Sequence, residues 1–543
     1  MGSALRIGLL AMLPVLSMGG TLRFAQRAEP KTFNPVIALD APSREVLRRM
    51  HADLITINRA TQQTMPGLAQ SWTVSRDGLE YVLKLRPGLR FSDGHAFTAD
   101  DVVFSFAAYL DERIHSPQRD LLIVHGVPVM VRKIDALTIA VRTAKPYAVT
   151  DRLFDSLAML PRHLLEEPWR AGKLGEAWAV SAAPETIAGL GPFRLKLYKP
   201  GEAVILERNP YYWKHPQPYL DGMEFRFLPD EDTQLARFIA GDLDVLNRVN
   251  PKAAPLLASK GLAPMDLGPG LEYNFVCFNL APGNPNEANF GKLEFRQALS
   301  LSVDRPALAR LIYQGKAAPI WGHVTPGNRL WYSASLPRPA RDTGAAHRLL
   351  TSAGFRLDGT TLRDPAGRAV SFSLLVASSQ AERLRMATML QEDWRALGIA
   401  VNIVPLELRA MIDRVTNTKQ FETCLLGLGG GDADPNAELP VWLSSGPMHL
   451  WHPNQREPRT AWEAEIDRLM GEQMVTLNPA RRRTMYERVQ QIVAEQVPMI
   501  FLVSPHVLVA RQPRVGNFHP ALLDHQTLWN ADELTVNGAG RQP

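Results

Sequence analysis

The sequence predicts an α/β protein built from more than one lobe, and three observations lead to this prediction. The chain has 543 residues, which is more than one hydrophobic core usually organises. Stretches of alternating hydrophobicity are followed repeatedly by amphipathic helical patterns, as in α/β proteins. The hydrophobic fraction of 45% and the charged fraction of 21% are ordinary for a globular protein. After the N-terminal segment, no run reaches the roughly 18 apolar residues that a membrane helix needs.

The first clear structural unit is expected between Ser71 and Tyr109. Strand patterns lie on both sides of Arg76-Asp77-Gly78, which is a hairpin turn signal. A helix is expected to begin at Thr98, because Asp101 stands three residues later and completes a capping box.

The second unit is expected between Gly189 and Val245. Two strand patterns are joined by the turn residues Pro200-Gly201. Asp230 and Asp232 favour the start of a helix, where the positive end of its dipole stabilises them.

The third unit begins near Leu271 and alternates strands with long helices. Strands are expected at 273–280, 399–403 and 499–503, and helices at 293–303, 380–397, 461–476 and 479–496. The helix that ends before Gly398 has the clearest apolar face, formed by Met386, Leu390, Trp394 and Leu397.

Charge and cysteine content argue against a nucleic-acid-binding protein and against a thiol redox protein. The net charge of +5 comes from scattered basic residues. The densest run, Arg481-Arg482-Arg483, lies in a helical pattern, which favours a solvated helix face and no nucleic-acid partner. Cys277 and Cys424 each lie in an apolar strand pattern, which favours two buried free thiols over a disulfide.

Residues 1–19 resemble a signal peptide. Arg6 precedes the apolar stretch Ile7–Leu16, and the small residues of Ser17-Met18-Gly19 suit a cleavage site. The alternative is an N-terminus without an export signal.

Catalytic motifs are missing from the sequence. There is no GxxxxGK[ST] phosphate loop, no GxSxG nucleophile elbow and no HExxH zinc motif. We therefore predict no catalytic residue and no cofactor. His449 and His452 have a spacing that could serve a metal on a helix. The neighbouring Trp451 and Pro453 favour a loop, so we predict packing or hydrogen bonding and no metal ligand.

A glycine-rich segment, GLGGGDADP at 427–435, is the most unusual local feature. One interpretation is a tight turn at a strand end. The other is a loop that faces a ligand and uses its carboxylates to hold an ammonium or hydroxyl group. Downstream, Trp442 and Trp451 are candidates for an aromatic cleft wall, whereas Trp462 has helical spacing with Ile466 and Leu469 and is assigned to the core.

Five sequence blocks, in order, resemble one family. They are EYVLKLRPGLRFSDGHAFTADDVVFSFAAY at 80–109, GPFRLKLYKPGEAVILERNPYYW at 191–213, AGDLDV at 240–245, FRQALSLSVDRPALARLIYQG at 295–315 and PMI at 498–500. They are similar to family 5 of the extracytoplasmic solute-binding proteins of ABC importers, the oligopeptide, dipeptide and nickel class.

The resemblance implies a three-lobed periplasmic-binding-protein fold (class II-like, cluster C), with hinged lobes of mixed sheets flanked by helices. Lobe I would comprise residues 20–50, 184–266 and 500–543, lobe II residues 51–183, and lobe III residues 267–499. Such lobes close on a solute that bridges them.

The implied function is capture of peptides or peptide-like solutes in an interlobe cleft and delivery to a membrane permease. Permease and ATPase subunits at the inner membrane would be the partners, the location periplasmic, and the protein a monomer that performs no catalysis. Three alternatives stay open: a nickel or metal-chelate binder of the same fold, a secreted hydrolase, and a receptor that passes its ligand to a sensor.

The resemblance also implies cleft residues. Phe33 and Asn34 match a stretch along the cleft floor. Peptide-binding relatives carry G-W-x-x-D-x-x-D/E-P, whose first Asp pairs with the peptide ammonium. Here Leu428 stands at the Trp position, Gly431 at the first Asp position and Asp434 at the second acidic position, while Asp432 is offset by one residue. This departure leaves a modified peptide, an opine-like compound or another small solute open as the ligand. The predicted ligand-binding residues are Phe33, Asn34, Leu428, Gly430, Gly431, Asp432, Asp434, Trp442 and Trp451.

Overall fold

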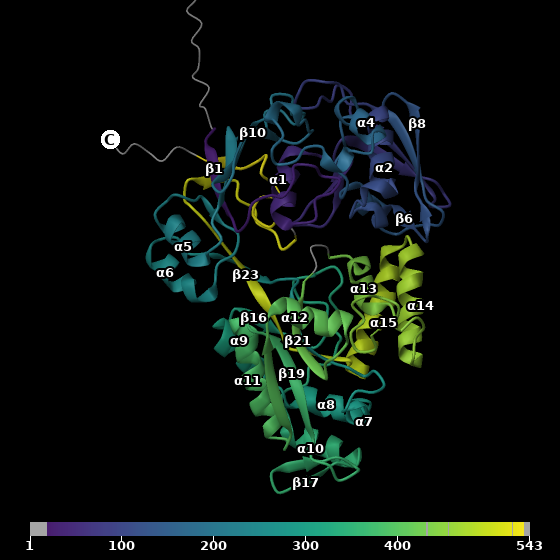
Figure 1. Ribbon diagram of the computed structural model, residues 1–543, viewed down its shortest axis with the longest axis vertical. Helices are drawn as coiled ribbons and strands as arrows, with labels where there is room; N and C mark the ends of the chain where they lie inside the picture. The colour runs from purple at the N-terminus through teal and green to yellow at the C-terminus, as the bar shows by residue number, and fades with distance from the viewer. Residues whose placement is uncertain (1–18, 430–432, 454, 524, 537–543) are drawn as a thin grey trace, which may run out of the picture.

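The structure is a computed structural model that describes residues 19–429, 433–453, 455–523 and 525–536. It is an α/β protein with three main sheets, as predicted, and it is elongated (Figure 1). Gly430, Gly431 and Asp432 of the predicted site, and the predicted signal peptide except for Gly19, lie outside the described residues.

The first sheet is mixed and is assembled from distant parts of the chain. Its strand order is β10-β11-β12-β1-β13-β23-β14, and β1 is parallel to both β12 and β13. A further strand, β16, pairs with β23. The bounds are β1 (Thr21–Gln26), β10 (Phe193–Lys199), β11 (Ala203–Arg208), β12 (Gly222–Phe227), β13 (Val245–Leu246), β14 (Met265–Pro269), β16 (Ala317–Pro319) and β23 (Val503–Arg511).

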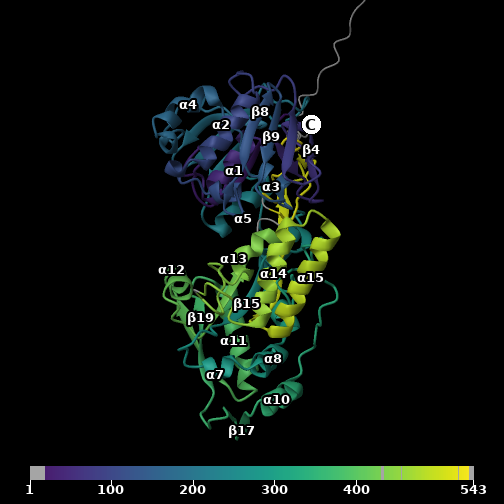
Figure 2. The ribbon, with the colours of Figure 1, turned by 90° about the vertical axis from the view of Figure 1, so that its right-hand side faces the viewer.

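The second sheet is antiparallel and contains the predicted hairpin. Its order is β4 (Ala69–Val74), β5 (Glu80–Leu85), β9 (Thr138–Arg142) and β8 (Met130–Asp135). Gly78 has a φ of 71°, which a left-handed turn position requires. Helix α2 (Ala99–Leu110) packs beside β8 (Figure 2). Thr98 with Asp101 forms the predicted capping box.

The third sheet has the order β20-β19-β21-β15-β22. Every residue of β15 (Tyr273–Phe278) is buried, which fits a strand with neighbours on both sides. Cys277 lies opposite Cys424, and both are buried free thiols, as predicted. The other bounds are β19 (Ser371–Ala377), β20 (Ala400–Leu406), β21 (Thr423–Leu428), β22 (Met499–Phe501), α8 (Leu293–Ser302), α9 (Arg305–Tyr313), α11 (Ala381–Arg395), α13 (Leu439–Trp442), α14 (Ala461–Val475) and α15 (Pro479–Gln496).

Smaller elements complete the surface. The remaining α-helices are α1 (Ala41–Met50), α3 (Thr150–Phe154), α4 (Arg162–Arg170), α5 (Glu231–Ile239), α6 (Ala254–Ser259), α7 (Glu287–Phe290), α10 (Thr343–Ser352) and α12 (Leu408–Ile412). Two-stranded ribbons are formed by β2 (Ile55–Ile57) with β3 (Thr64–Pro66), β6 (Ile123–Val124) with β7 (Val127–Pro128), β17 (Arg356–Asp358) with β18 (Thr361–Arg363), and β24 (Val515–Gly516) with β25 (Thr535–Val536).

Buried residues divide the molecule into two bodies. One core joins the first and second sheets, from Leu22 to Val245 in chain order and again from Val509 to Val536, and a small separate cluster lies between Phe238 and Leu257 with Leu508 and Ala510; we call this part the upper body. A second core lies within residues 273–503 around the third sheet, which we call the lower body. Lobes I and II therefore share a core, whereas lobe III has its own.

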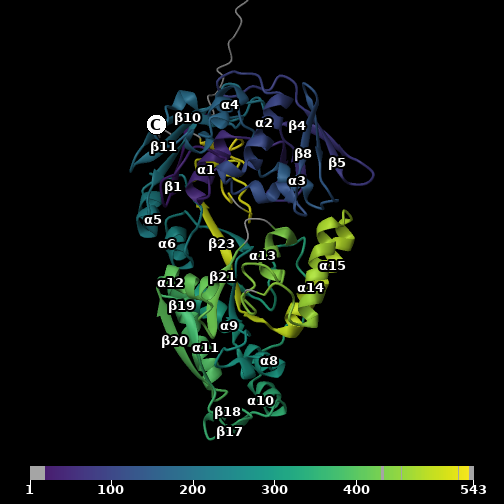
Figure 3. The same cartoon turned by 45° about the vertical axis from the view of Figure 1, so that its right-hand side comes forward.

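Two paired strands, β14 and β23, connect the bodies. They run antiparallel, with Met265 opposite Val509. Figure 3 shows β23 passing from the upper body into the lower body. The predicted boundary between residues 499 and 500 cuts through β22, which belongs to the third sheet, so the chain changes body within β23 instead. Between its pairing with β16 and its pairing with β13, β23 has β14 as its one strand neighbour in the described part of the chain, which is a geometry suited to a hinge.

Within the residues described, no helix combines the length and the apolar character needed to cross a membrane.

Candidate functional site

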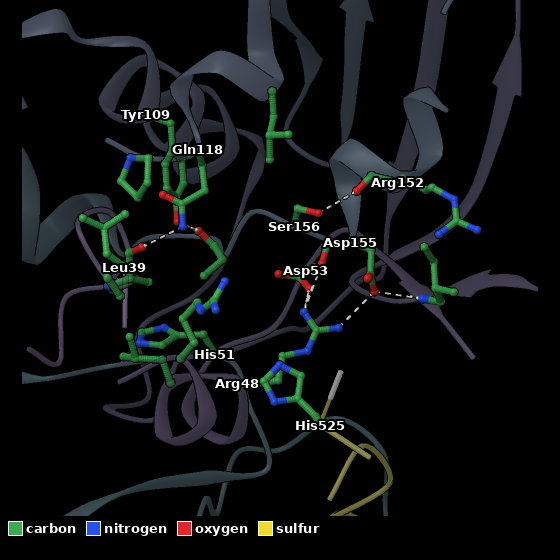
Figure 4. A pocket seen from close by; sticks show the side chains of 18 of the residues that line it. Leu39, Arg48, His51, Asp53, Tyr109, Gln118, Arg152, Asp155, Ser156 and His525 are labelled. Carbon is green, nitrogen blue, oxygen red and sulfur yellow. Dashed lines mark hydrogen bonds and ion pairs between the residues drawn. The ribbon is translucent and has the colours of Figure 1, made fainter. Parts of the chain in front are cut away.

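A cavity of about 380 Å³ opens in the upper body (Figure 4). Helix α1 supplies one wall, and its N-terminus is fixed by Asp40, whose carboxylate accepts a hydrogen bond from Ser43 N at 2.8 Å. The segment after α1, the end of α2, the end of α3 and the C-terminal region supply the rest. The side chains that line the cavity include Arg48, His51, Asp53, Arg59, Tyr109, Arg152, Asp155 and His525.

Asp155 organises the charged wall of this cavity. It accepts hydrogen bonds from Arg48 Nη2 at 2.9 Å, Arg59 Nη2 at 2.7 Å and Ile57 N at 2.8 Å. Arg48 also pairs with Asp53, as the dashed lines in Figure 4 show. These groups are buried charges that have hydrogen-bonded partners, which makes their burial tolerable.

Asp53 is the less well compensated of the two carboxylates. Burial raises its pKa to about 7, against the lowering effect of Arg48, and the like charge of Asp155 raises it further. A carboxyl group that titrates near neutrality inside a cavity can present either a donor or an acceptor to a solute.

His51 lines the cavity with unused hydrogen-bonding capacity. The ring stacks on Trp178 with centroids 5.8 Å apart, and neither ring nitrogen has a hydrogen-bond partner. Burial lowers its pKa to about 4, so the neutral ring offers one donor and one acceptor. A buried polar group without a partner is costly unless something else binds it.

Arg152 links the cavity to the lower body. It lines the cavity from α3, and its Nε lies 3.8 Å from Asp434 Oδ2. Two hydrogen bonds accompany this contact: Ala148 N donates to Met474 O at 2.7 Å, and Asn436 Nδ2 donates to the Tyr147 hydroxyl at 3.3 Å. The cavity therefore adjoins the surface where the two bodies meet.

Asp434, a predicted ligand residue, has structural partners. Arg482 donates to both of its oxygens, at 2.9 and 3.0 Å, and the carboxylate also caps the following turn through Asn436 N. Only 3% of the residue is exposed. This arrangement favours the structural interpretation of the acidic segment at this position.

The other predicted site residues within the described chain lie in cores. Phe33 and Asn34 have no exposed surface; Phe33 packs edge-on against Tyr198, and Asn34 Nδ2 donates to Leu174 O at 2.7 Å. Their neighbour Pro35 does line the cavity.

In the lower body, Leu428 ends β21 and packs against the core. Trp442 and Trp451 are buried with ring centroids 5.6 Å apart, so neither ring offers area to a solute in this conformation. Trp462, assigned to the core, packs against the same cluster.

Sequence reasoning missed the charged residues of the cavity wall. Arg48, Asp53, Arg59 and Asp155 come from separate segments, and no motif joins them. One sequence signal could have pointed to a buried charge here. Arg48 and Arg49 lie on a helix next to the apolar residues Val46, Leu47 and Met50, and arginines beside a buried apolar face need ionic or hydrogen-bonding partners.

A potential metal-ligand set lies elsewhere, in the lower body. It consists of His449, His452 and Glu463, whose candidate ligand atoms all lie within 4.8 Å of one another. All three are buried, and none lines the cavity of the upper body.

Comparisons with known proteins agree with one another. A family model described as bacterial extracellular solute-binding proteins, family 5 middle, matches residues 63–449. A probable ABC transporter-binding protein of Deinococcus radiodurans is 26% identical over 529 residues, covering 92% of this chain and 89% of that protein. Di/tripeptide-binding protein 1 of Pseudomonas aeruginosa is 26% identical over 538 residues, covering 95% of each.

A solved structure has the same fold. The ABC transporter substrate-binding protein CtaP from Listeria monocytogenes superposes with a TM-score of 0.79 at 22% identity, covering 95% of this chain and 99% of that one. The predicted three-lobed periplasmic-binding-protein fold is thereby confirmed.

Proposed function

From the premise that this chain belongs to family 5 of the bacterial extracellular solute-binding proteins, we propose that it captures a short peptide or peptide-like solute for an ABC importer. The solute binds in the upper-body cavity, is enclosed when the lower body closes over it, and is passed on unchanged to a permease. The protein works outside the cytoplasm, in the periplasm, as a monomer, with permease and ATPase subunits as its partners.

The observation that carries this proposal is the cavity of about 380 Å³ beside the contact between the bodies. Its volume is near the lower end of the range for small-molecule sites, which suits a solute of a few residues better than a long peptide. His51 supports the same conclusion, because its two free nitrogens can pair with the amide groups of a peptide main chain. The di/tripeptide-binding relative from Pseudomonas aeruginosa is consistent with a ligand of this size.

Native mass spectrometry of the freshly purified chain tests the proposal. We expect a complex with a small peptidic mass, which fragmentation identifies as two to a few residues. A thermal-shift panel of dipeptides and tripeptides then ranks ligands by the rise in melting temperature. A chain that carries no peptidic mass and that no peptide stabilises contradicts the proposal.

A further inference from the structure

The loop before α14 and the first turn of α14 bring two histidines and a glutamate together in the lower body. His449 Nε2 lies 3.1 Å from Glu463 Oε1, and His452 Nδ1 lies 2.6 Å from the same oxygen. All candidate donor atoms are within 4.8 Å of one another, and the three residues are buried. The sequence predicts packing or hydrogen bonding for the two histidines, because the neighbouring Trp451 and Pro453 favour a loop over a helix.

Hydrogen bonding leaves two acceptor atoms in contact at His449. Its Nδ1 lies 3.1 Å from Val441 O, which can only accept, so Nδ1 is the donor of this ring. Its Nε2 therefore faces Glu463 Oε1 at 3.1 Å as one acceptor facing another. The amide nitrogen of Gln455 lies 2.9 Å from the same Nε2 and can donate to it, which leaves the contact between Nε2 and Oε1 without a proton between the two atoms.

Gln455 adds the second observation. The residue is only 8% exposed, its Nε2 points at His449 Nε2 and at Glu463 Oε1, and its Oε1 has no hydrogen-bond partner. Rotating the amide by half a turn places Oε1 toward the same centre, which already holds two imidazole nitrogens and a carboxylate oxygen. A single cation there accepts all four lone pairs at once and leaves the proton on His449 Nδ1.

We infer that His449, His452, Glu463 and Gln455 form a structural site for a divalent transition metal, with zinc as the best match. Two nitrogen and two oxygen donors suit tetrahedral zinc. Ligands about 2.1 Å from zinc lie roughly 3.4 Å apart. The present separations of 2.6 and 3.1 Å from Glu463 Oε1 therefore need side-chain shifts of less than about 1 Å.

The surroundings orient these ligands as metal sites require. Val441 O fixes the His449 ring, and Trp451 Nε1 donates to Glu463 Oε1 at 3.0 Å. Glu463 Oε2 is held separately by Thr460 N at 3.0 Å and its hydroxyl at 2.9 Å. His452 also lines a cavity of about 600 Å³ together with Thr460 and Trp462, which provides an entry path for the ion.

This metal would be part of the protein rather than its transported solute. It fastens the loop that contains His449 and His452 to the start of α14, whose far end reaches Met474, a contact of the upper body. The role is independent of which solute the upper cavity holds.

The test uses the full chain, stripped with a chelator and dialysed, and zinc as the probe. We expect one zinc per chain by competition with a chromophoric chelator, a higher melting temperature with zinc, and reversal by EDTA. Cobalt should give the visible absorption of a four-coordinate nitrogen and oxygen site. His452→Gln should weaken zinc binding about 100-fold, and Gln455→Ala should weaken it less.

A matched control separates this site from incidental binding by a histidine beside a carboxylate. His506 pairs with Asp266 at 2.9 Å, and His506→Gln should leave zinc stoichiometry and affinity unchanged. The proposal is overturned if wild-type protein binds no stoichiometric zinc, or if cobalt shows only six-coordinate absorption. The cobalt measurement needs no variant, so it decides the question even where His452→Gln does not fold.

Discussion

Each body buries a carboxylate, and the two carboxylates are compensated to different degrees for the loss of contact with water. Glu463 in the lower body accepts hydrogen bonds from Trp451, His452 and Thr460; although burial opposes its ionisation, these neighbours hold its pKa well below its usual range. Asp53 in the upper body shares Arg48 with a second carboxylate, Asp155, and burial raises its pKa. Glu463, with all its hydrogen bonds made inside the protein, stabilises the fold. Asp53, with fewer partners, lines the cavity, where a bound solute could supply a further hydrogen bond.

The largest effect should come from removing Glu463. Glu463→Ala leaves His452, Trp451 and Thr460 without their acceptor in a buried site, so the free energy of unfolding of the lower body should fall by about 3–5 kcal/mol. Urea unfolding followed by tryptophan fluorescence measures it. The control is Glu465→Ala on the same helix, a partly exposed carboxylate paired with Arg488, where a change of about 0–1 kcal/mol is expected. Similar losses in both variants would contradict the structural role of Glu463.

Asp155 and Asp53 should differ within the upper cluster. Asp155→Asn weakens the hydrogen bonds from Arg48, Arg59 and Ile57 and should lower the free energy of unfolding by about 2–3 kcal/mol. Asp53→Asn leaves Arg48 with Asp155 and should cost less than about 1 kcal/mol. Chemical denaturation of both variants checks the order; the reverse order would show that Asp53 is the better compensated carboxylate.

The pH dependence of stability should isolate Asp53. Its pKa is 3.8 in the unfolded chain and about 7 in the folded one, so the folded state binds the proton more tightly. The resulting stabilisation is present in full below the unfolded value and is lost as the pH rises through about 7. Between about pH 5 and pH 8, the wild type should lose about 2–3 kcal/mol relative to Asp53→Asn. Parallel pH profiles of the two proteins would refute the raised pKa.

His51 should give the smallest change, and it should be confined to binding. His51→Phe keeps the stacking on Trp178 but removes both unpartnered nitrogens, so folding stability should hold or rise slightly. Affinity for the co-purified solute should fall about tenfold, which corresponds to one lost hydrogen bond. Isothermal titration calorimetry measures the affinity. An unchanged affinity would place the solute away from His51.

Local sequence signals predicted the fold well because they act over a few residues. The Thr98 capping box, the Gly78 turn and the Gly398 helix end are all present, since each depends on its neighbours alone. The family blocks supplied the order of the lobes, which local patterns could not.

The site was harder to predict because its members meet only after folding. Arg48 and Asp155 are 107 positions apart, and no spacing rule relates them. Asp434 matched a family motif, yet its partner Arg482, a residue assigned from sequence to a solvated helix face, is buried against it. A residue at this motif position can therefore have a structural role or a ligand-binding role. Its hydrogen-bond partner in the folded protein is needed to distinguish the two.

The proposed function requires the two bodies to close on a solute, with the bend at β14 and β23. Small-angle X-ray scattering of the full chain, first stripped of solute and then saturated with the peptide that co-purifies, tests this closure most directly. Closure predicts a smaller radius of gyration in the saturated protein and a return to the larger value when the solute is removed. Identical scattering profiles in both states, at a solute concentration where calorimetry shows saturation, would contradict it.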